Sequence, residues 1–108
     1  MHLLHLFKGL ADPVRLRIVH LLVQQGELCV CHLTDALSLP QSTISRHLNT
    51  LKHAGLVASE RRGQWVYYRM QDASAHIDAI SQLIKRSAVA DEGLQSDLAR
   101  VKNSTCFN

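Results

Sequence analysis

Apolar residues recur every three or four positions through the first half of the chain, which is the spacing of amphipathic helices. The first such stripe consists of Leu3, Leu6, Phe7 and Leu10. A second helix is expected to begin at Asp12 and Pro13, because Asp caps a helix N-terminus and Pro suits the first helical position, and to end at Gly26. Its inward face carries Val14, Ile18, Leu21 and Leu22.

Two shorter helices joined by a tight turn are expected next. The third helix begins near Cys29. Its inward side consists of Val30, Leu33 and Leu37. After a turn at Ser38-Leu39-Pro40, the fourth helix runs from about Gln41 to Ala54, and Gly55 closes it. Its buried stripe consists of Ile44, Leu48 and Leu51.

The pattern then changes to strand propensity. The segments Leu56–Glu60 and Trp65–Met70 predict a two-stranded hairpin, and residues 61–64 form a basic tip between them. The helical period returns over Asp72–Arg86, and residues 89–101 either continue that helix or form another short one. The predicted fold is mainly α with a small β-hairpin (α+β), a dimeric winged helix-turn-helix in one domain, 1–102, followed by a flexible tail, 103–108.

Composition narrows the class of protein. A chain of 108 residues with 46% apolar residues is long enough for one domain with a small core and is not expected to be disordered. The net charge of +3 fits a nucleic-acid partner but is weak evidence alone. No apolar run approaches the roughly 20 residues of a membrane helix, and the opening residues lack a signal-peptide pattern, so a cytoplasmic protein with reduced thiols and no membrane partner is expected.

The fourth helix has an outward face suited to double-stranded DNA. At about 100° per residue, hydrogen-bonding side chains cover the side opposite the apolar stripe, while His47 falls about 60° from that stripe and is expected to be half packed. With the arginines of the hairpin tip, the predicted DNA contacts are Gln41, Ser42, Thr43, Ser45, Arg46, His47, Asn49, Thr50, Arg61, Arg62 and Gln64. The alternatives are a solvated helix surface and a solubilising turn, which the combination of helix pair and hairpin disfavours.

Cys29 and Cys31 form a Cys-x-Cys pair at the start of the third helix. Thiolates select soft ions, and a helix N-terminus favours the thiolate. On a regular helix the two side chains lie about 200° apart, so they cannot both face one core, and joint binding of an ion has to unwind the first turn. Two small buried core residues are the alternative interpretation.

The combined pattern resembles the arsenic-responsive repressors of the ArsR/SmtB family. The segments that carry the resemblance are Phe7–Ile18, Glu27–Cys31, Ser42–Leu48, His53–Val57 and Arg62–Arg69. The resemblance implies no enzyme and no obligatory cofactor, but a homodimer that represses an arsenic-resistance operon from an imperfect inverted repeat. It also implies that As(III) or Sb(III) is the inducing ligand, that arsenite or antimonite releases the protein from DNA, and that Cys29 and Cys31 are the thiol site.

One position departs from that family. Its arsenite-binding members carry a third thiol three residues past the second, where this chain has Thr34. Cys106, from the same or the partner chain, and a small cellular thiol are the candidate third ligands, and a plain tail residue is the alternative for Cys106. His32 beside the pair is a borderline donor, and a solvated surface residue is the favoured interpretation. The family's second metal site on the last helix is expected to be absent, because no later His follows Asp72 and His76.

Other functions remain in competition with the arsenic-responsive repressor. A redox- or zinc-responsive repressor of the same fold uses the same thiols. A thiol enzyme or metal chaperone is disfavoured, since the chain has no Gly-rich phosphate loop or Cys-x5-Arg loop. A constitutive DNA-packaging protein has no need of the Cys pair. In a repressor, the first helix and the 72–86 helix are expected to form a two-fold interface that sets two recognition helices about 34 Å apart.

Overall fold

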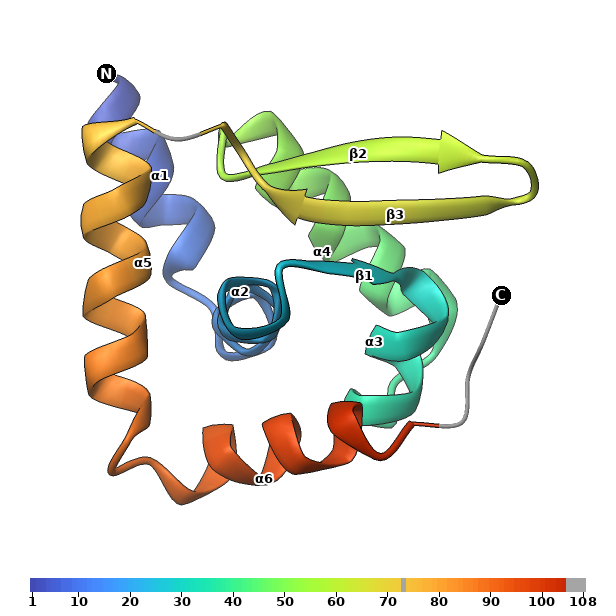
Figure 1. Cartoon of the computed structure of the whole chain (residues 1–108). Helices are drawn as coiled ribbons and strands as arrows, with labels where there is room; N and C mark the ends of the chain where they lie inside the picture. Colours follow the sequence, from blue (N-terminus) through green and yellow to red (C-terminus); the bar gives the residue numbers. More distant parts are fainter. Residues whose placement is uncertain (73, 105–108) are drawn as a thin grey trace.

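The computed structural model describes residues 1–72 and 74–104 and shows a helical body with a projecting β-sheet (Figure 1). Over these residues the helices are α1 (His2–Leu10), α2 (Pro13–Gln25), α3 (Val30–Leu37), α4 (Gln41–His53), α5 (Ala75–Ala88) and α6 (Glu92–Lys102). The strands are β1 (Glu27–Cys29), β2 (Val57–Arg62) and β3 (Trp65–Met70). The winged helix-turn-helix predicted from the sequence is confirmed, with α3 and α4 as the helix pair.

The core gathers around α2, which lies in the middle of the body (Figure 1). Its middle residues are buried on every side because α1, α4, α5, α6 and the sheet all contact this helix. The predicted helix start is confirmed: Asp12 Oδ2 accepts hydrogen bonds from the backbone N–H groups of Val14 (2.9 Å) and Arg15 (3.0 Å), and Pro13 is the first helical residue. The helix ends at Gly26, whose φ of 85° suits glycine.

The sheet has three antiparallel strands in the order β1-β3-β2, whereas the sequence predicted two. Residues 27–29, placed before or within the third helix by the sequence pattern, pair with β3, and Cys29 lies opposite Tyr67. A strand of three residues is too short to show alternation. The tip is also shorter than predicted, because Arg61 and Arg62 still belong to β2 and only Gly63 and Gln64 turn the chain.

The C-terminal part contains two helices rather than one. The helix expected over 72–86 begins at Ala75, where the Ser74 side chain caps it by accepting a hydrogen bond from Ile77 N–H (3.2 Å). α6 then runs back across α3 as a separate helix. Asp97 of α6 is 1% exposed and accepts hydrogen bonds from Arg17 of α2. Of the predicted tail, residues 105–108 lie outside the described part of the chain.

The end of α1 lies very close to the segment that follows α4. Cβ of any larger residue at Gly9 would lie 2.8 Å from Leu56 Cδ1 and 2.9 Å from Ala54 Cβ, closer than carbon atoms can approach. Gly9 therefore permits the close approach of α1 to this segment.

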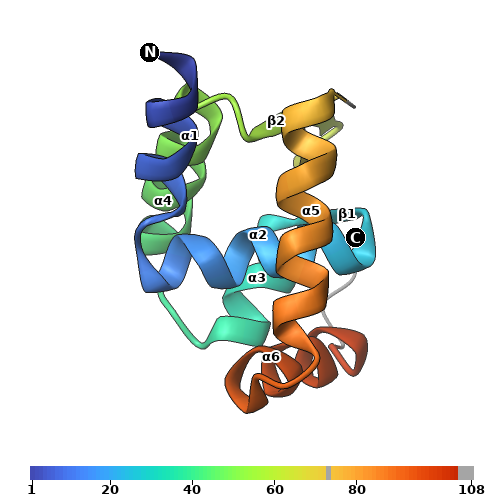
Figure 2. The same ribbon diagram turned by 90° about the vertical axis from the view of Figure 1, so that its left-hand side faces the viewer.

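The other side of α1 and the adjoining side of α5 form one exposed face (Figure 2). Several large apolar side chains of α1, of α5 and of the residue that follows α5 are exposed in the single chain: Leu3, Leu4, Phe7, Leu83 and Val89. Leu83 is 63% exposed and Phe7 is 54% exposed. The sequence pattern assigned the apolar stripes of these two helices to a two-fold interface, but Leu6, Ile77, Ile80 and Ile84 of those stripes are buried in the core of the single chain. The residues left for such an interface are the exposed ones.

The buried side chain of His20 makes the free energy of unfolding depend on pH. It is fully buried on α2, and its Nδ1 has no hydrogen-bond partner in the described part of the chain. Burial lowers the pKa of His20, and the charges of Asp97 and Asp91 only partly oppose this effect. The unfolded chain therefore binds a proton more readily, so the free energy of unfolding falls as the pH drops below about 6.5, the pKa of unfolded histidine.

We expect urea denaturation to show a larger loss of stability between pH 7.5 and 5.5 in the wild type than in His20→Leu. A variant of the exposed His53, His53→Gln, serves as the control and should keep the wild-type pH dependence. The same loss in the wild type and in His20→Leu would contradict this prediction.

Candidate DNA-binding and thiol sites

The recognition helix α4 has the two faces that its sequence predicts. Ile44, Leu48 and Leu51 are fully buried against the body. On the opposite side the exposed polar residues are Gln41, Ser42, Ser45, Arg46, Asn49 and Thr50, while Thr43 is half-buried at the edge. The helix thus presents a continuous polar surface next to the wing, which consists of β2, β3 and the turn between them.

His47 lies between these faces, as predicted. Its side chain is 13% exposed, its Nδ1 is 3.3 Å from Arg15 Nη1, and the same atom is 3.9 Å from Asp12 Oδ2. Arg15 also donates to the carbonyl of Gly9 (2.7 Å) at the end of α1. The hydrogen bond from the Arg15 backbone N–H is the largest cause that lowers the pKa of Asp12, and this carboxyl group stays ionised. His47 therefore ties α4 to the junction of α1 and α2.

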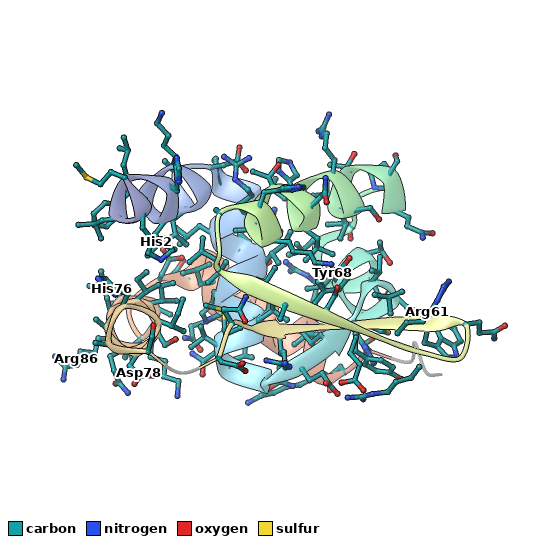
Figure 3. The ribbon with its side chains drawn as sticks, turned by 90° about the horizontal axis from the view of Figure 1, so that it is seen from above. His2, Arg61, Tyr68, His76, Asp78 and Arg86 are labelled. Atoms are coloured by element: carbon teal, nitrogen blue, oxygen red, sulfur yellow. The ribbon has the colours of Figure 1, made fainter. Side chains whose placement is uncertain are left out.

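The two arginines of β2 are in different environments. Arg61 is exposed and projects from the wing near its tip (Figure 3). Arg62 donates to both carboxylate oxygens of Glu27 (2.7 and 2.8 Å) and to Glu60 (3.1 Å), and its guanidinium lies 4.7 Å from the centre of the Tyr67 ring. These carboxylates raise the pKa of Arg62 and occupy its donors. The sequence alone did not separate the roles of the two residues.

The thiol pair does not have the helical geometry expected from its spacing. Cys29 is the last residue of β1 and the N-cap of α3, with ψ at 163°, whereas Cys31 is the second residue of α3. The separation of 200° around one helix is therefore wrong for this pair, because only one member is helical. Cys29 is 1% exposed and Cys31 is half-buried.

His32 is turned back toward Cys29, rather than being the solvated residue that the sequence suggested. Its Nδ1 lies 3.0 Å from Cys29 Sγ and accepts a hydrogen bond from the Cys29 backbone N–H at 3.4 Å. Cys106, the candidate third ligand, lies outside the described residues. Residues 1–72 and 74–104 contain no cluster of three His, Cys, Asp or Glu side chains arranged for a metal ion.

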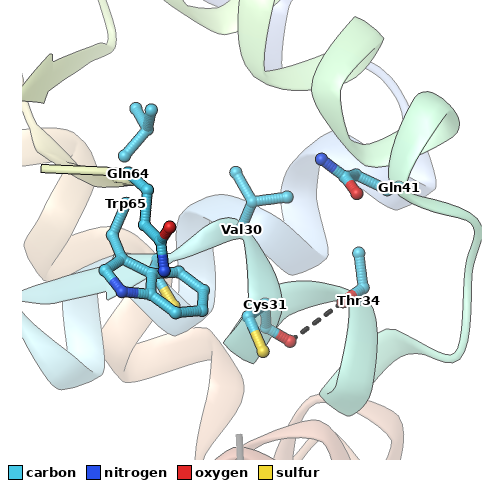
Figure 4. Close-up of a pocket in the computed structure, with 8 residues that line it drawn as sticks. Val30, Cys31, Thr34, Gln41, Gln64 and Trp65 are labelled. Carbon is cyan, nitrogen blue, oxygen red and sulfur yellow. Dashed lines mark hydrogen bonds between the residues drawn. The ribbon is translucent and has the colours of Figure 1, made fainter. Parts of the chain in front are cut away.

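A cavity of about 350 Å³ lies between the thiol pair, the start of α4 and the wing (Figure 4). Its walls come from the β1–α3 junction, the start of α4 and the wing: Cys29, Val30, Cys31, Thr34, Gln41, Gln64, Trp65 and Val66. Thr34, which stands at the position of the family's third thiol, lines this cavity and donates a hydrogen bond to the Cys31 carbonyl (2.9 Å). The sequence did not reveal the approach of Gln64 and Trp65 to the thiols, since it depends on the pairing of β1 with β3.

Comparison with known proteins agrees with this arrangement. Residues 12–59 match the family described as "Bacterial regulatory protein, arsR family". The homodimeric winged helix-turn-helix DNA-binding domain of a Mycobacterium bovis protein, solved in solution, is 31% identical, with a TM-score of 0.68 over 99% of this chain and 88% of that chain. The chain belongs to the arsR family.

Relatives in the arsR family include regulators of arsenic resistance. The arsenic resistance transcriptional regulator ArsR1 of Pseudomonas putida is 56% identical over 59% of this chain and 50% of its own length. The arsenical resistance operon repressor of Escherichia coli is 51% identical over 70% of this chain and 62% of its own length. The chain thus spans between half and two thirds of these two relatives. Both are transcriptional regulators rather than enzymes.

The arsR-family chain has no helix, among its described residues, of the length and apolarity needed to cross a lipid bilayer.

Proposed function

We propose that this chain is a homodimeric repressor that binds operator DNA and is released when trivalent arsenic or antimony binds at Cys29 and Cys31. The observation that carries the proposal is the cavity that the two cysteines line together with the first residue of the recognition helix and the turn end of the wing. A ligand at this position contacts the elements that read DNA, which gives it different affinities for the DNA-bound and free states.

The proposed DNA surface consists of the polar face of α4 and the exposed end of the wing. Its partner is double-stranded DNA carrying an imperfect inverted repeat, because a two-fold dimer repeats its contacts on two half-sites. The contact residues proposed from the sequence are retained: Gln41, Ser42, Thr43, Ser45, Arg46, His47, Asn49, Thr50, Arg61, Arg62 and Gln64. Among them Arg46 and Arg61 are exposed, whereas His47 and Arg62 also hold other residues of the chain. A protein with this partner is proposed to work in the cytoplasm.

The proposed ligand is As(III) or Sb(III) as inducer, with no obligatory cofactor. Both are soft ions that thiolates bind well, and under reducing conditions Cys29 and Cys31 supply two sulfur donors from one short segment. Cys106 or a small cellular thiol is the proposed third donor. Binding at both cysteines removes Cys29 Sγ from its contact with His32 and changes the junction between β1 and α3.

The test begins with selection of binding sequences from a random duplex pool, because the operator is defined by what the protein selects. An inverted repeat is the expected result. Fluorescence anisotropy on that duplex, under reducing conditions, then measures DNA affinity while arsenite, antimonite, zinc or peroxide is added. Release by arsenite and antimonite supports the proposal. Release by zinc or peroxide alone would replace it with the zinc- or redox-responsive repressor.

Arg46 and Arg61 are expected to serve different purposes in DNA binding. Arg46→Ala should weaken binding to the selected duplex by about 1–3 kcal/mol, because a base-reading arginine discriminates by that amount. Arg61→Ala should weaken binding to all duplexes alike. It should also reduce the slope of log affinity against log salt concentration by about one, the value for one phosphate contact. Anisotropy titrations on selected and random duplexes at several salt concentrations distinguish the two effects. Equal losses on both duplexes for Arg46→Ala would remove it from the base-reading set.

A further inference from the structure

We infer that the ion pair between Glu27 and Arg62 is the link through which the thiol site controls the wing. This inference rests on the proposed function, since it assigns a route for the metalloid response. For Arg62 it replaces the direct DNA contact proposed above with a positioning role, because Glu27 occupies its guanidinium, and it gives Glu27 a regulatory role.

The route starts in β1, which carries both Glu27 and Cys29. Residues two apart in a strand project from the same face, so the carboxylate and the thiol share one side of β1. β3 pairs with β1 on one edge and with β2 on the other, and its Tyr67 lies opposite Cys29 in β1 and opposite Glu60 in β2. The thiol-bearing strand is thus an integral part of the sheet that forms the wing.

Arg62 crosses that sheet from β2 to β1. Its guanidinium passes over the Tyr67 ring at 4.7 Å and donates to both oxygens of Glu27, at 2.7 and 2.8 Å. A single exposed ion pair contributes little, but a two-pronged contact held by a second carboxylate and an aromatic face has one defined geometry. The contact joins the two outer strands, which share no backbone hydrogen bonds.

A ligand on the thiols acts on this contact through the backbone. Cys29 ends β1 and caps α3, so bringing its sulfur and that of Cys31 onto one ion changes the direction of the chain at this junction. Glu27, two residues earlier on the same strand, then moves relative to Arg62, and the end of β2 moves with it. Arg61 is the neighbouring exposed residue, so the displacement alters how the wing meets DNA.

The experiment compares three glutamine variants by the ratio of DNA affinity without and with arsenite. Glu27→Gln and Arg62→Gln each remove the bridge between β1 and β2. Glu60→Gln is the matched control, because it removes a carboxylate from the same arginine but leaves the bridge to β1. We expect the ratio of DNA affinity without and with arsenite to be about fivefold smaller in the first two variants than in wild type, which is at the low end of typical couplings between sites. In Glu60→Gln this ratio should stay within twofold of wild type.

Two further measurements separate this role from others. Trp65 is the only tryptophan of the chain and lines the thiol cavity, so its fluorescence reports arsenite binding without DNA. Arsenite affinity of the free variants should stay within twofold of wild type. In the double variant Glu27→Gln/Arg62→Gln, the ratio of DNA affinity without and with arsenite should fall no further than in either single variant.

The outcomes are distinguishable. No response to arsenite in the wild type would overturn the proposed function itself. A wild-type response that all variants retain in full would overturn only the link through Glu27 and Arg62. If Arg62→Gln weakens DNA binding equally with and without arsenite, Arg62 is a direct phosphate contact, and the inference is wrong.

Discussion

Replacing either Cys29 or Cys31 with serine is expected to abolish release from DNA by arsenite and antimonite, while DNA affinity without metalloid stays within about twofold. Each cysteine supplies one of two strong donors from the chain, and hydroxyl is a poor ligand for a soft ion. With one thiol left, the ligand cannot bring two sulfurs together. The β1–α3 junction then keeps its conformation, and DNA affinity is not lowered. Neither residue belongs to the proposed DNA surface. Anisotropy with arsenite titrated under reducing conditions measures both quantities.

Two companion variants sharpen this result. Cys106→Ser is expected to respond like wild type, with a small external thiol completing the coordination; a strong loss would identify Cys106 as the third ligand. Thr34→Cys, which adds a thiol to the cavity wall at the family position, should lower the arsenite concentration needed for release. Full induction retained in both Cys29→Ser and Cys31→Ser would place the sensor site elsewhere.

A charge on the exposed apolar face should separate the proposed dimer. Leu83 of α5 is 63% exposed in the single chain, and a glutamate there has to be buried in the interface beside its two-fold copy. Leu83→Glu is therefore expected to be a monomer at micromolar concentration. Its affinity for the inverted repeat should fall by about 100-fold or more, since the energy of the second half-site is no longer gained in the same binding event.

Sizing with light scattering and anisotropy measure these effects. Gln25→Glu introduces the same charge at the exposed end of α2 and should remain dimeric with unchanged thermal stability. A wild type that elutes as a monomer, or a Leu83→Glu protein that still dimerises, would show that α5 does not form the interface.

The helices were predictable because their signals are local. Asp12 and Pro13 begin α2 and Gly26 ends it, each through contacts within a few residues, and the apolar spacing of α4 fixes which side is buried. The strand β1 was missed for the opposite reason. Its three residues become a strand by pairing with Tyr67, Tyr68 and Arg69, about 40 positions later, and short-range pattern carries no information about that pairing.

The sequence identified the residues of the candidate site but not the contacts that they make. The residue types of Cys29, Cys31 and Arg46 suggested soft-ion binding and DNA contact, and both assignments stay predictions. The partners of Arg62 do not follow from residue type, because Glu27 lies 35 positions away and meets it only when β1 joins the sheet. The turn of His32 toward Cys29 likewise follows from Cys29 being the cap of α3.

The absent side chain of Gly9 bears on the distance between the two halves of an operator. α1 carries part of the proposed interface on one side and lies close to Ala54 and Leu56, just after α4, on the other. In a two-fold assembly any widening of this contact moves both recognition helices away from the axis, and the separation between them grows by twice the shift. In the proposed dimer, the close approach that Gly9 allows would therefore be one determinant of the number of base pairs between the two half-sites.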